Sequence, residues 1–164
     1  MIGIASTQDK VEYMKGLGFD HGVTYVGKTE QQLYEELKAL APNGVDIYYD
    51  NVGGVISNAV LRLLNPNGRV PICGQITQYQ KEVFDDPPAE TLQELKEKNV
   101  ERGWFLVLSY FDRYQEGWNE LFKWVQEGKL QVHHTIYEGI EKLPQAFFDL
   151  FAGKNIGKLT VKIN

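Results

Sequence analysis

Residues 44–54 read Gly-Val-Asp-Ile-Tyr-Tyr-Asp-Asn-Val-Gly-Gly, and they decide the fold class of this chain. An apolar run ends abruptly in an acid, an amide and two glycines. This pattern is typical of a buried parallel strand where it reaches the ligand-binding edge of an α/β sheet. Asn51 would place a short polar side chain there, and Gly53 and Gly54 would let backbone approach a bound molecule. The sequence therefore predicts a small-molecule crevice at this turn.

The composition excludes several classes of partner. The chain has 164 residues, of which 43% are hydrophobic, and its formal net charge is −5, with basic residues that form no cluster. These values predict a globular domain with its own core and no nucleic-acid partner. No apolar run is long enough to span a membrane, so we expect no membrane partner.

The cysteine and histidine content predicts neither a disulfide nor a metal site. Cys73 is the single cysteine of the sequence, so it cannot form an internal disulfide. His21, His133 and His134 lack metal-ligand spacing around it, so we expect no metal. A reducing cytoplasmic location is the simplest expectation.

Strand and helix patterns alternate along the chain. Residues 6–9 offer a helix N-cap after the first apolar run, and Thr29 caps the next helix. The alternation predicts an α/β fold with a parallel sheet and right-handed crossovers. The expected strands are residues 2–5, 22–25, 45–49, 69–73, 105–110, 130–137 and 158–163.

The segment that leaves the fourth expected strand reads Cys73-Gly74-Gln75-Ile76-Thr77-Gln78-Tyr79 and opens a long polar loop that extends to residue 88. Loops of this length inside compact domains are often functional. Gly74 would let backbone approach a nicotinamide ring, and Tyr79 could donate a hydrogen bond to a ribose or a developing enolate. The alternative is a plain surface loop with Tyr79 as an aromatic lid. We expect Cys73 to be a small buried residue rather than a nucleophile.

Three further segments each allow two interpretations. Ser6, Thr7 and Lys10 follow the first strand, and hydroxyls with a cation suit the ribose phosphate of NADPH better than NADH. The alternative is an N-cap with a solvated lysine. Residues 50–54 could contact a cofactor or could simply be a capped strand-to-helix turn. Asn155, between two glycines, could reach a ligand or belong to a solvated turn.

Taken together, these segments resemble the medium-chain dehydrogenase/reductase superfamily, and more narrowly its zinc-independent prostaglandin reductase branch, which includes leukotriene B4 12-hydroxydehydrogenase and 2-alkenal reductases. The quinone reductase branch shares the Asn-Val-Gly-Gly segment and is the alternative. The resemblance runs from the first residue to the last. The matching motifs are Lys10-Val11-Glu12-Tyr13, Leu17-Gly18-Phe19-Asp20, Asp50-Asn51-Val52-Gly53-Gly54, Cys73-Gly74-Gln75-Ile76, Trp104-Phe105-Leu106-Val107-Leu108, Trp124-Val125-Gln126-Glu127-Gly128-Lys129 and Asn155-Ile156-Gly157-Lys158.

The resemblance implies NADP(H) as cofactor and hydride transfer to the β-carbon of an enone, a small-molecule substrate. Tyr79 would be the catalytic residue, because its hydroxyl could stabilise the enolate. Leu106, Val107 and Leu108 would lie beside the substrate. The cofactor-binding residues implied are Lys10 at the 2′-phosphate, Tyr25 near the adenosine, Asn51, Cys73, Gly74, Gln75, Ile76, Thr77, Gln78 and Tyr79, the main chain of Phe105, Leu106 and Val107, and Asn155.

The chain departs from that resemblance at its beginning. Family members carry a GroES-like substrate domain, then a first Rossmann strand and a glycine-rich turn that holds the pyrophosphate. This sequence begins at what would be the second strand. We therefore expect a truncated Rossmann-like, doubly wound, mostly parallel sheet over residues 1–164 without its first strand, and little or no activity. Residues 2–5 and 45–49 would flank the missing strand in the order 3-2-1-4-5-6, leaving two open edges or pairing with each other.

A non-enzymatic reading is also open. Family dimers pair the strand equivalent to residues 105–110 across a two-fold axis, and these residues are rich in aromatic and β-branched side chains. The chain could therefore be a non-catalytic dimerising or binding remnant that forms a homodimer through this strand.

Overall fold

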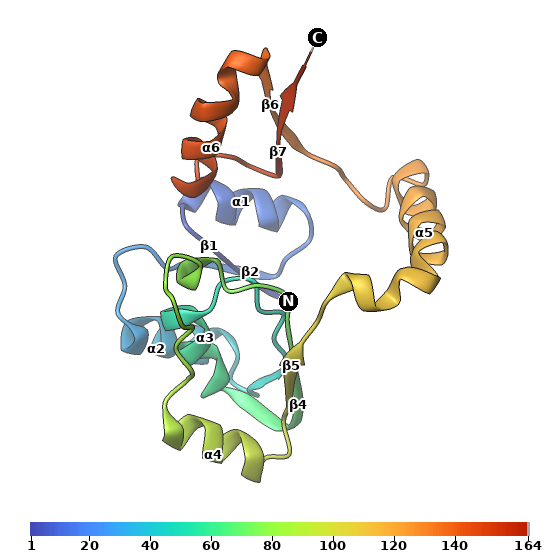
Figure 1. Ribbon diagram of the computed structural model, residues 1–164. Helices are drawn as coiled ribbons and strands as arrows, with labels where there is room; N and C mark the ends of the chain where they lie inside the picture. Colours follow the sequence, from blue (N-terminus) through green and yellow to red (C-terminus); the bar gives the residue numbers. More distant parts are fainter. Residues whose placement is uncertain (164) are drawn as a thin grey trace. The chain divides into compact units, whose positions relative to one another are not determined.

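The computed structural model describes residues 1–163, in which short strands alternate with helices (Figure 1). All strand pairs in this part of the chain are parallel, so the predicted α/β class is confirmed. The chain divides into two compact units, Met1–Ser109 and Tyr110–Asn164. Each unit is described by itself below.

The first unit holds two parallel sheets. Strand β1 pairs with β2, and β3, β4 and β5 form the second sheet in that order. Figure 1 shows the first sheet in blue, and β4 and β5 in green and yellow. The elements are β1 (Ile2–Ala5), α1 (Gln8–Gly16), β2 (His21–Thr24), α2 (Glu30–Leu40), β3 (Val45–Ile47), α3 (Gly54–Leu61), β4 (Leu64–Ile72), α4 (Ala89–Glu97) and β5 (Glu101–Trp104).

The predicted helix starts are confirmed in their capping contacts. The hydroxyl of Thr7 accepts from the backbone N–H of Lys10 at the start of α1. At α2, Thr29 and Gln32 form a reciprocal capping box. Each cap satisfies backbone groups that a helix leaves without internal partners.

Two clusters of buried side chains form the core of the first unit. One joins α2 and α3 to the β1–β2 sheet through Val23, Leu33, Leu37, Ala59 and Val60, among others. The other joins β4 to α3 and α4 and includes Leu61, Leu64, Val70, Ile72 and Leu95. Helix α3 contributes to both clusters, so it ties the two sheets together.

The two sheets do not join through β1 and β3. Strand β1 pairs with β2, β3 pairs with β4, and within residues 1–163 no ladder links β1 to β3. Of the two predicted outcomes, two open edges or a direct pairing, the structure has the first. The predicted single sheet is therefore divided at this place.

The second unit contains α5 (Tyr114–Gln126), β6 (His134–Glu138), α6 (Leu143–Phe151) and β7 (Lys158–Lys162). Strands β6 and β7 form a parallel pair. Gly128 follows the end of α5 and Gly153 follows the end of α6, and both glycines have positive φ. The strand expected over residues 130–137 begins four residues late, at His134, because the ladder with β7 starts there, at Lys158.

The predicted strand over residues 105–110 is wrong. Strand β5 ends at Trp104, and Val107–Arg113 form 3-10 turns with a kink at Tyr110. The last ladder hydrogen bond runs from Phe105 N–H to the Ile72 carbonyl at 2.8 Å, where β4 itself ends. Apolar and aromatic composition favours a strand only where a neighbouring strand is present to pair with it. The predicted homodimer would pair residues 105–110 as strands, and these residues do not form a strand here. Dimerisation stays a prediction that this segment does not support.

Candidate functional site

The turn after β3 is built around a buried carboxylate. Asp50 is 1% exposed and bridges to Ile72 of β4. Its carboxylate accepts from the backbone N–H groups of Val52 and Gly53, at 3.0 Å each. It also accepts from the hydroxyls of Tyr48, at 3.0 Å, and of Ser57. Asp50 thus holds the shape of the turn and lies too deep to contact a ligand directly.

Tyr48 completes this buried cluster. Burial raises the pKa of its hydroxyl, and the neighbouring Asp50 charge raises it further. Both effects disfavour a second negative charge beside the carboxylate. Tyr48 therefore remains a protonated donor to Asp50 at physiological pH.

Asn51 is the exposed residue of the turn, whereas Gly53 is buried and Gly54 is half-buried. Gly53 and Gly54 have φ values of +73° and +60°. A Cβ on Gly53 would lie 2.9 Å from the Cβ of Gln75, so the next loop packs directly on this glycine. The two interpretations of residues 50–54, a capped strand-to-helix turn and a cofactor contact, are compatible. The buried Asp50 carboxylate caps the turn, and the exposed Asn51 side chain is left available for a ligand.

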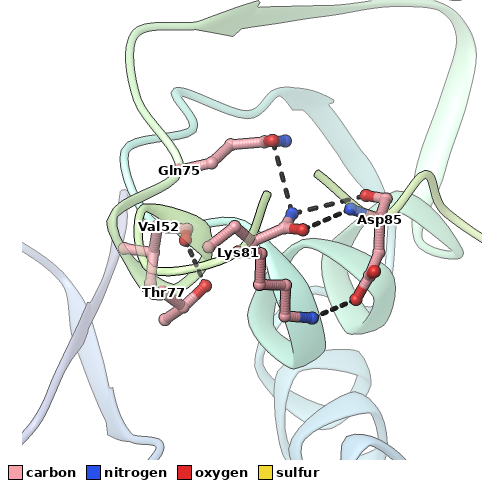
Figure 2. Close-up of polar contacts among 6 residues, drawn as sticks. Val52, Gln75, Thr77, Lys81 and Asp85 are labelled. Carbon is pink, nitrogen blue, oxygen red and sulfur yellow. Dashed lines mark hydrogen bonds and ion pairs between the residues drawn. The ribbon is translucent and has the colours of Figure 1, made fainter. Parts of the chain in front are cut away.

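The loop that follows β4 is fastened to this turn (Figure 2). The Thr77 hydroxyl donates to the Val52 carbonyl at 2.6 Å, and the Thr77 N–H donates to the same oxygen at 3.1 Å. The Ile76 N–H donates to the Asn51 carbonyl at 3.3 Å. Residues 73–79 and 50–54 are therefore one structural unit, as ligand binding by both segments requires.

Gln75 and Gln78 are the buried polar side chains of this loop. The Gln78 amide donates to the Gln75 side chain and to the Asp85 carbonyl, each at 3.3 Å, and its oxygen accepts from the Asp85 N–H (Figure 2). Lys81 pairs with the Asp85 carboxylate. The two glutamine side chains thus hold the loop together, and Ile76 and Thr77 are its outward members.

Tyr79 lies over the backbone of Gly74. Its side chain is 55% exposed, and a Cβ on Gly74 would lie 2.8 Å from its hydroxyl oxygen. The ring stacks on Phe84 with centroids 6.0 Å apart, and Phe84 contacts Trp104 at 6.1 Å. This aromatic row keeps the Tyr79 hydroxyl at the carboxyl end of β4.

The prediction that Cys73 is buried is wrong. Its thiol is exposed at the end of β4, and the Tyr49 side chain hydrogen-bonds to it, which raises the pKa of Tyr49.

Three predicted site segments follow adjacent strand ends. Ile72 pairs with Trp104, and Asp50 bridges to Ile72, so the strands end side by side at residues 50–51, 73–74 and 105–106. Leu106, Val107 and Leu108 continue from there and are exposed.

Lys10 and Tyr25 belong to the other sheet of the first unit. Lys10 is in the first turn of α1, directly after β1, and Tyr25 follows β2, with its N–H bound to the Ala5 carbonyl at 3.1 Å. Both therefore follow the carboxyl ends of β1 and β2. The Tyr25 ring packs partly against the core, so it is less available than predicted.

Asn155 lies in the second unit. Its side-chain amide donates to the Gly157 carbonyl at 2.8 Å within its own loop. Next to it, the Lys154 ammonium, Gln145 and Tyr137 all bond the Asp149 carboxylate and hold the pKa of that group down at about 2. A contact between Asn155 and a cofactor stays a prediction.

Sequence reasoning missed Tyr48, Ser57 and the row of Phe84 and Trp104. A signal existed for the first two residues. Tyr48 and Asp50 are two positions apart and share a strand face, and Ser57 is in the first turn of α3. No such spacing relates Phe84 to Trp104, which meet only in the folded chain.

The described residues lack two features that would give the site a different chemistry or setting. Residues 1–163 contain no group of three or more His, Cys, Asp or Glu side chains placed to hold a metal ion. No helix in the same range is long and apolar enough to cross a membrane. The candidate site thus consists of strand ends, glycines, an exposed amide and a tyrosine.

Nucleotide-binding α/β domains hold their ligands beyond the carboxyl ends of parallel strands, where these polar residues lie. The family described as "Zinc-binding dehydrogenase" matches residues 17–161, and this chain belongs to it. The chain is 41% identical to YfmJ of Bacillus subtilis, named as an NADP-dependent oxidoreductase, over all of this chain and 48% of that protein. It is 39% identical to mouse prostaglandin reductase 1, over 99% of this chain and 49% of the relative.

The similarity extends to solved structures. CurA of Vibrio vulnificus, crystallised in complex with NADPH, superposes with a TM-score of 0.89 at 34% identity, over 99% of this chain and 49% of that one. The chain thus spans about half the length of the relatives it matches. The resemblance to the prostaglandin reductase branch is confirmed at the level of the family and its similar members.

Proposed function

We propose that this chain is the nucleotide-binding part of an NADPH-dependent reductase that reduces the carbon–carbon double bond of α,β-unsaturated aldehydes and ketones. One observation carries the proposal: the Asp50–Gly54 turn and the loop of residues 73–79 are joined at adjacent strand ends, with Asn51 and Tyr79 outermost. The similarity to an NADPH complex over 99% of the chain supports the choice of cofactor.

The residues present fit such a cofactor. Gly54 has positive φ, and a Cβ there would meet the Thr77 hydroxyl at 3.2 Å, so the backbone is open only because the side chain is absent. Asn51 would hydrogen-bond the cofactor, with Gly74, Ile76 and Thr77 along the nicotinamide half. Lys10 would attract the 2′-phosphate by charge, because a cation favours the dianionic group.

When bound, NADPH supplies the hydride for the β-carbon of the enone. The electron pair of the double bond then moves to the carbonyl oxygen, and a proton from solvent completes the α-carbon. The Tyr79 hydroxyl would donate to that developing oxyanion or to the nicotinamide ribose. The exposed apolar residues Leu106, Val107 and Leu108 would contact the substrate.

Backbone amide shifts in NMR spectra, which detect weak binding, test the cofactor assignment. NADPH should shift the amides of residues 51–54 and 74–79, and Asn51→Ala should weaken this binding. Lys10→Ala should reduce the preference for NADPH over NADH, whereas Lys15→Ala, on the same helix and paired with Glu12, should not. If NADPH shifts none of these amides, the proposal is wrong.

NADPH oxidation in the presence of a 2-alkenal tests the reaction separately from binding. Consumption of NADPH and enone in equal amounts, with the saturated carbonyl as product, would support the assignment. Oxidation driven by a quinone and not by a 2-alkenal would instead favour the quinone reductase alternative.

A further inference from the structure

Three exposed aromatic rings form a row at the carboxyl ends of β4 and β5. Tyr79 and Phe84 stack with ring centroids 6.0 Å apart and an angle of 23° between their planes, and Phe84 contacts Trp104 at 6.1 Å and 36°. Tyr79, Phe84 and Trp104 are 55%, 38% and 62% exposed. Each ring therefore touches its neighbour and still presents part of its face to a ligand.

The aromatic row is continuous with the candidate site. Tyr79 is at one end, where its hydroxyl lies over the backbone of Gly74. Trp104 is at the other end and pairs with Ile72, the last residue of β4, so both ends of the row stand at the same edge of the sheet. A molecule whose carbonyl meets the Tyr79 hydroxyl would therefore have its remaining part beside Phe84 and Trp104.

The loop that carries Phe84 is held from both sides. The buried Gln78 side chain bonds both the N–H and the carbonyl of Asp85, the residue directly after Phe84. Pro87 and Pro88 then lead into α4, and each proline restricts its own backbone and that of the residue before it. Phe84 is thus fixed before a ligand binds, which lowers the entropic cost of binding.

The rim of the aromatic row is acidic. Residues 80–88 contain one lysine and three acids, a net charge of −2. The lysine, Lys81, pairs with the Asp85 carboxylate (Figure 2). Glu82 and Asp86, which are exposed and stand two residues to either side of the phenylalanine, therefore set the charge beside its ring. Flat aromatic groups gain from stacking on such rings, whereas a carboxylate meets like charge there.

We propose that the aromatic row binds the aryl group of an uncharged, aryl-conjugated enone and that its acidic rim disfavours substrates that carry a carboxylate. Phe84 and Trp104 are then specificity-determining residues, and Tyr79 serves both the ring and the carbonyl. The inference rests on the proposed function for the reacting group. It goes further in selecting among α,β-unsaturated carbonyl compounds by the group on the β-carbon.

Three enones that differ in that group test the proposal: benzalacetone, its para-carboxylate, and the analogue with a hexyl chain in place of the phenyl ring. Each is titrated into the full chain with NADP⁺, which carries no hydride to transfer, so binding is measured without turnover. Benzalacetone should shift the NMR signals of the Trp104 indole N–H and the Phe84 ring, and should bind about threefold to tenfold more tightly than the hexyl analogue. The para-carboxylate should bind about twofold to fivefold more weakly than benzalacetone at low salt.

Conservative variants separate the rings from general stability. Phe84→Leu and Trp104→Leu keep apolar bulk and remove an aromatic face, so each should weaken benzalacetone binding about threefold or more and leave the hexyl analogue unchanged. Phe84→Tyr should retain the affinity for benzalacetone. Tyr34→Leu is the control, because it removes a ring of α2 that lies against Arg62, with the guanidinium carbon 4.0 Å from the ring centroid, and it should change neither affinity.

The acidic rim has its own test. Glu82→Gln combined with Asp86→Asn should raise the affinity for the para-carboxylate about twofold to fivefold and leave that for benzalacetone unchanged. A para-carboxylate that binds more tightly than benzalacetone to the parent chain would overturn this part of the proposal. It would point instead to Arg102, two residues before Trp104 on β5, as the partner of the carboxylate.

The outcomes distinguish the aromatic row from the proposed cofactor site. Equal affinities for benzalacetone and the hexyl analogue, or a benzalacetone preference that survives both leucine variants, would overturn the role of the row. Absence of a benzalacetone shift at Trp104 would overturn it as well, whatever the cofactor does. A benzalacetone shift at Trp104 without NADP⁺ shifts at residues 51–54 would support the row and count against the cofactor site alone.

Discussion

Two turns of the molecule, residues 50–54 in the first unit and 153–157 in the second, are each held by an aspartate and a tyrosine hydroxyl. Tyr48 donates to Asp50 at 3.0 Å, and Tyr137 donates to Asp149 at 2.8 Å. Both turns were candidate ligand contacts in the sequence. They differ in what else the carboxylate binds.

Asp50 binds the turn itself. Two of its partners are backbone N–H groups of residues 52 and 53, and Asp50 itself and Ser57 are buried. Asp149 binds side chains, those of Lys154, Gln145 and Tyr137, and the Lys154 side chain is well exposed. The backbone conformation of the first turn therefore depends on the Asp50 carboxylate. The second turn depends on its glycines, and removal of the Asp149 carboxylate would cost it only contacts between side chains.

The largest expected effect is that of Asp50→Ala. The substitution leaves two backbone N–H groups and two hydroxyls without their shared acceptor in a buried place. We expect a loss of about 3 kcal/mol or more in the free energy of unfolding of the first unit. Urea denaturation of the variant, followed by circular dichroism, measures it.

Asp46→Ala is the matched control, since Asp46 is an exposed aspartate of β3 whose carboxylate accepts from the Asn65 amide at 2.9 Å. Its change should stay within about 0.5 kcal/mol. Equal losses in the two variants would show that the Asp50 cluster does not hold the turn.

The second prediction compares the glycines of the two turns. Gly53 and Gly157 have φ values of +73° and +70°, so alanine costs about 1–3 kcal/mol at either place from backbone strain alone. A Cβ on Gly53 would press on the Gln75 side chain, whereas one on Gly157 would strike the His133 carbonyl, which is backbone. Gly157→Ala should therefore be more destabilising than Gly53→Ala. Hydrogen exchange measures this: the amides of β6 and β7 in Gly157→Ala should lose more protection than those of β3 and β4 in Gly53→Ala.

Gly117→Ala provides the control for these substitutions, because that glycine is inside α5 with nothing within 4 Å of its Cβ position. It should be neutral or stabilising by about 0.5–1 kcal/mol. If Gly53→Ala were the more damaging of the two turn variants, packing of residue 75 would matter more than the backbone clash.

Much of the fold was predictable from local signals. Thr7 and Thr29 stand at helix starts, and Gly128 and Gly153 stand at helix ends, because capping chemistry depends on a few adjacent residues. The strand predicted at residues 105–110 failed for the opposite reason. Its composition is that of a strand, but strand length depends on how far β4 extends beside it.

The candidate site was predictable in its segments and not in its contacts. The spacing of Asn51, Gly53 and Gly54 after an apolar run placed the turn correctly. Nothing local shows that Thr77 bonds Val52 or that Gln75 and Gln78 turn inward, because these contacts depend on how two loops meet. Cys73 was expected inside, and its exposure reflects the end of β4 rather than the residue type.

The third prediction sharpens the comparison at the joint between the two loops of the first unit. Thr77→Val removes the hydroxyl that donates to Val52 at 2.6 Å while keeping the side-chain shape. We expect a loss of about 1 kcal/mol, because the backbone N–H of Thr77 still donates to the same oxygen. Thr77→Ser should keep the hydrogen bond and most of the stability. A Thr77→Val protein as stable as the parent in urea would show that the N–H alone fastens the loop.

The smallest effect at neutral pH is expected for Asp149→Asn, since an amide keeps the size of the carboxylate and one acceptor. Its signature is a pH dependence. The hydrogen bond from Lys154, followed by those from Gln145 and Tyr137, lowers the pKa of Asp149 to about 2, whereas an unfolded aspartate titrates at about 3.9. A lowered folded pKa contributes stability that is complete above about pH 4 and is lost as the pH falls through about 2. The parent and Asp149→Asn proteins should therefore differ in stability above about pH 4 and converge near pH 2, as measured by thermal unfolding across that range.

Lys154→Ala removes the largest cause of the lowered Asp149 pKa, so it should raise that pKa in a carboxyl-carbon NMR titration. Parallel stability profiles over the whole range would mean that the Asp149 charge does not stabilise the second turn, and the contrast with Asp50 would then rest on the backbone partners of Asp50 alone.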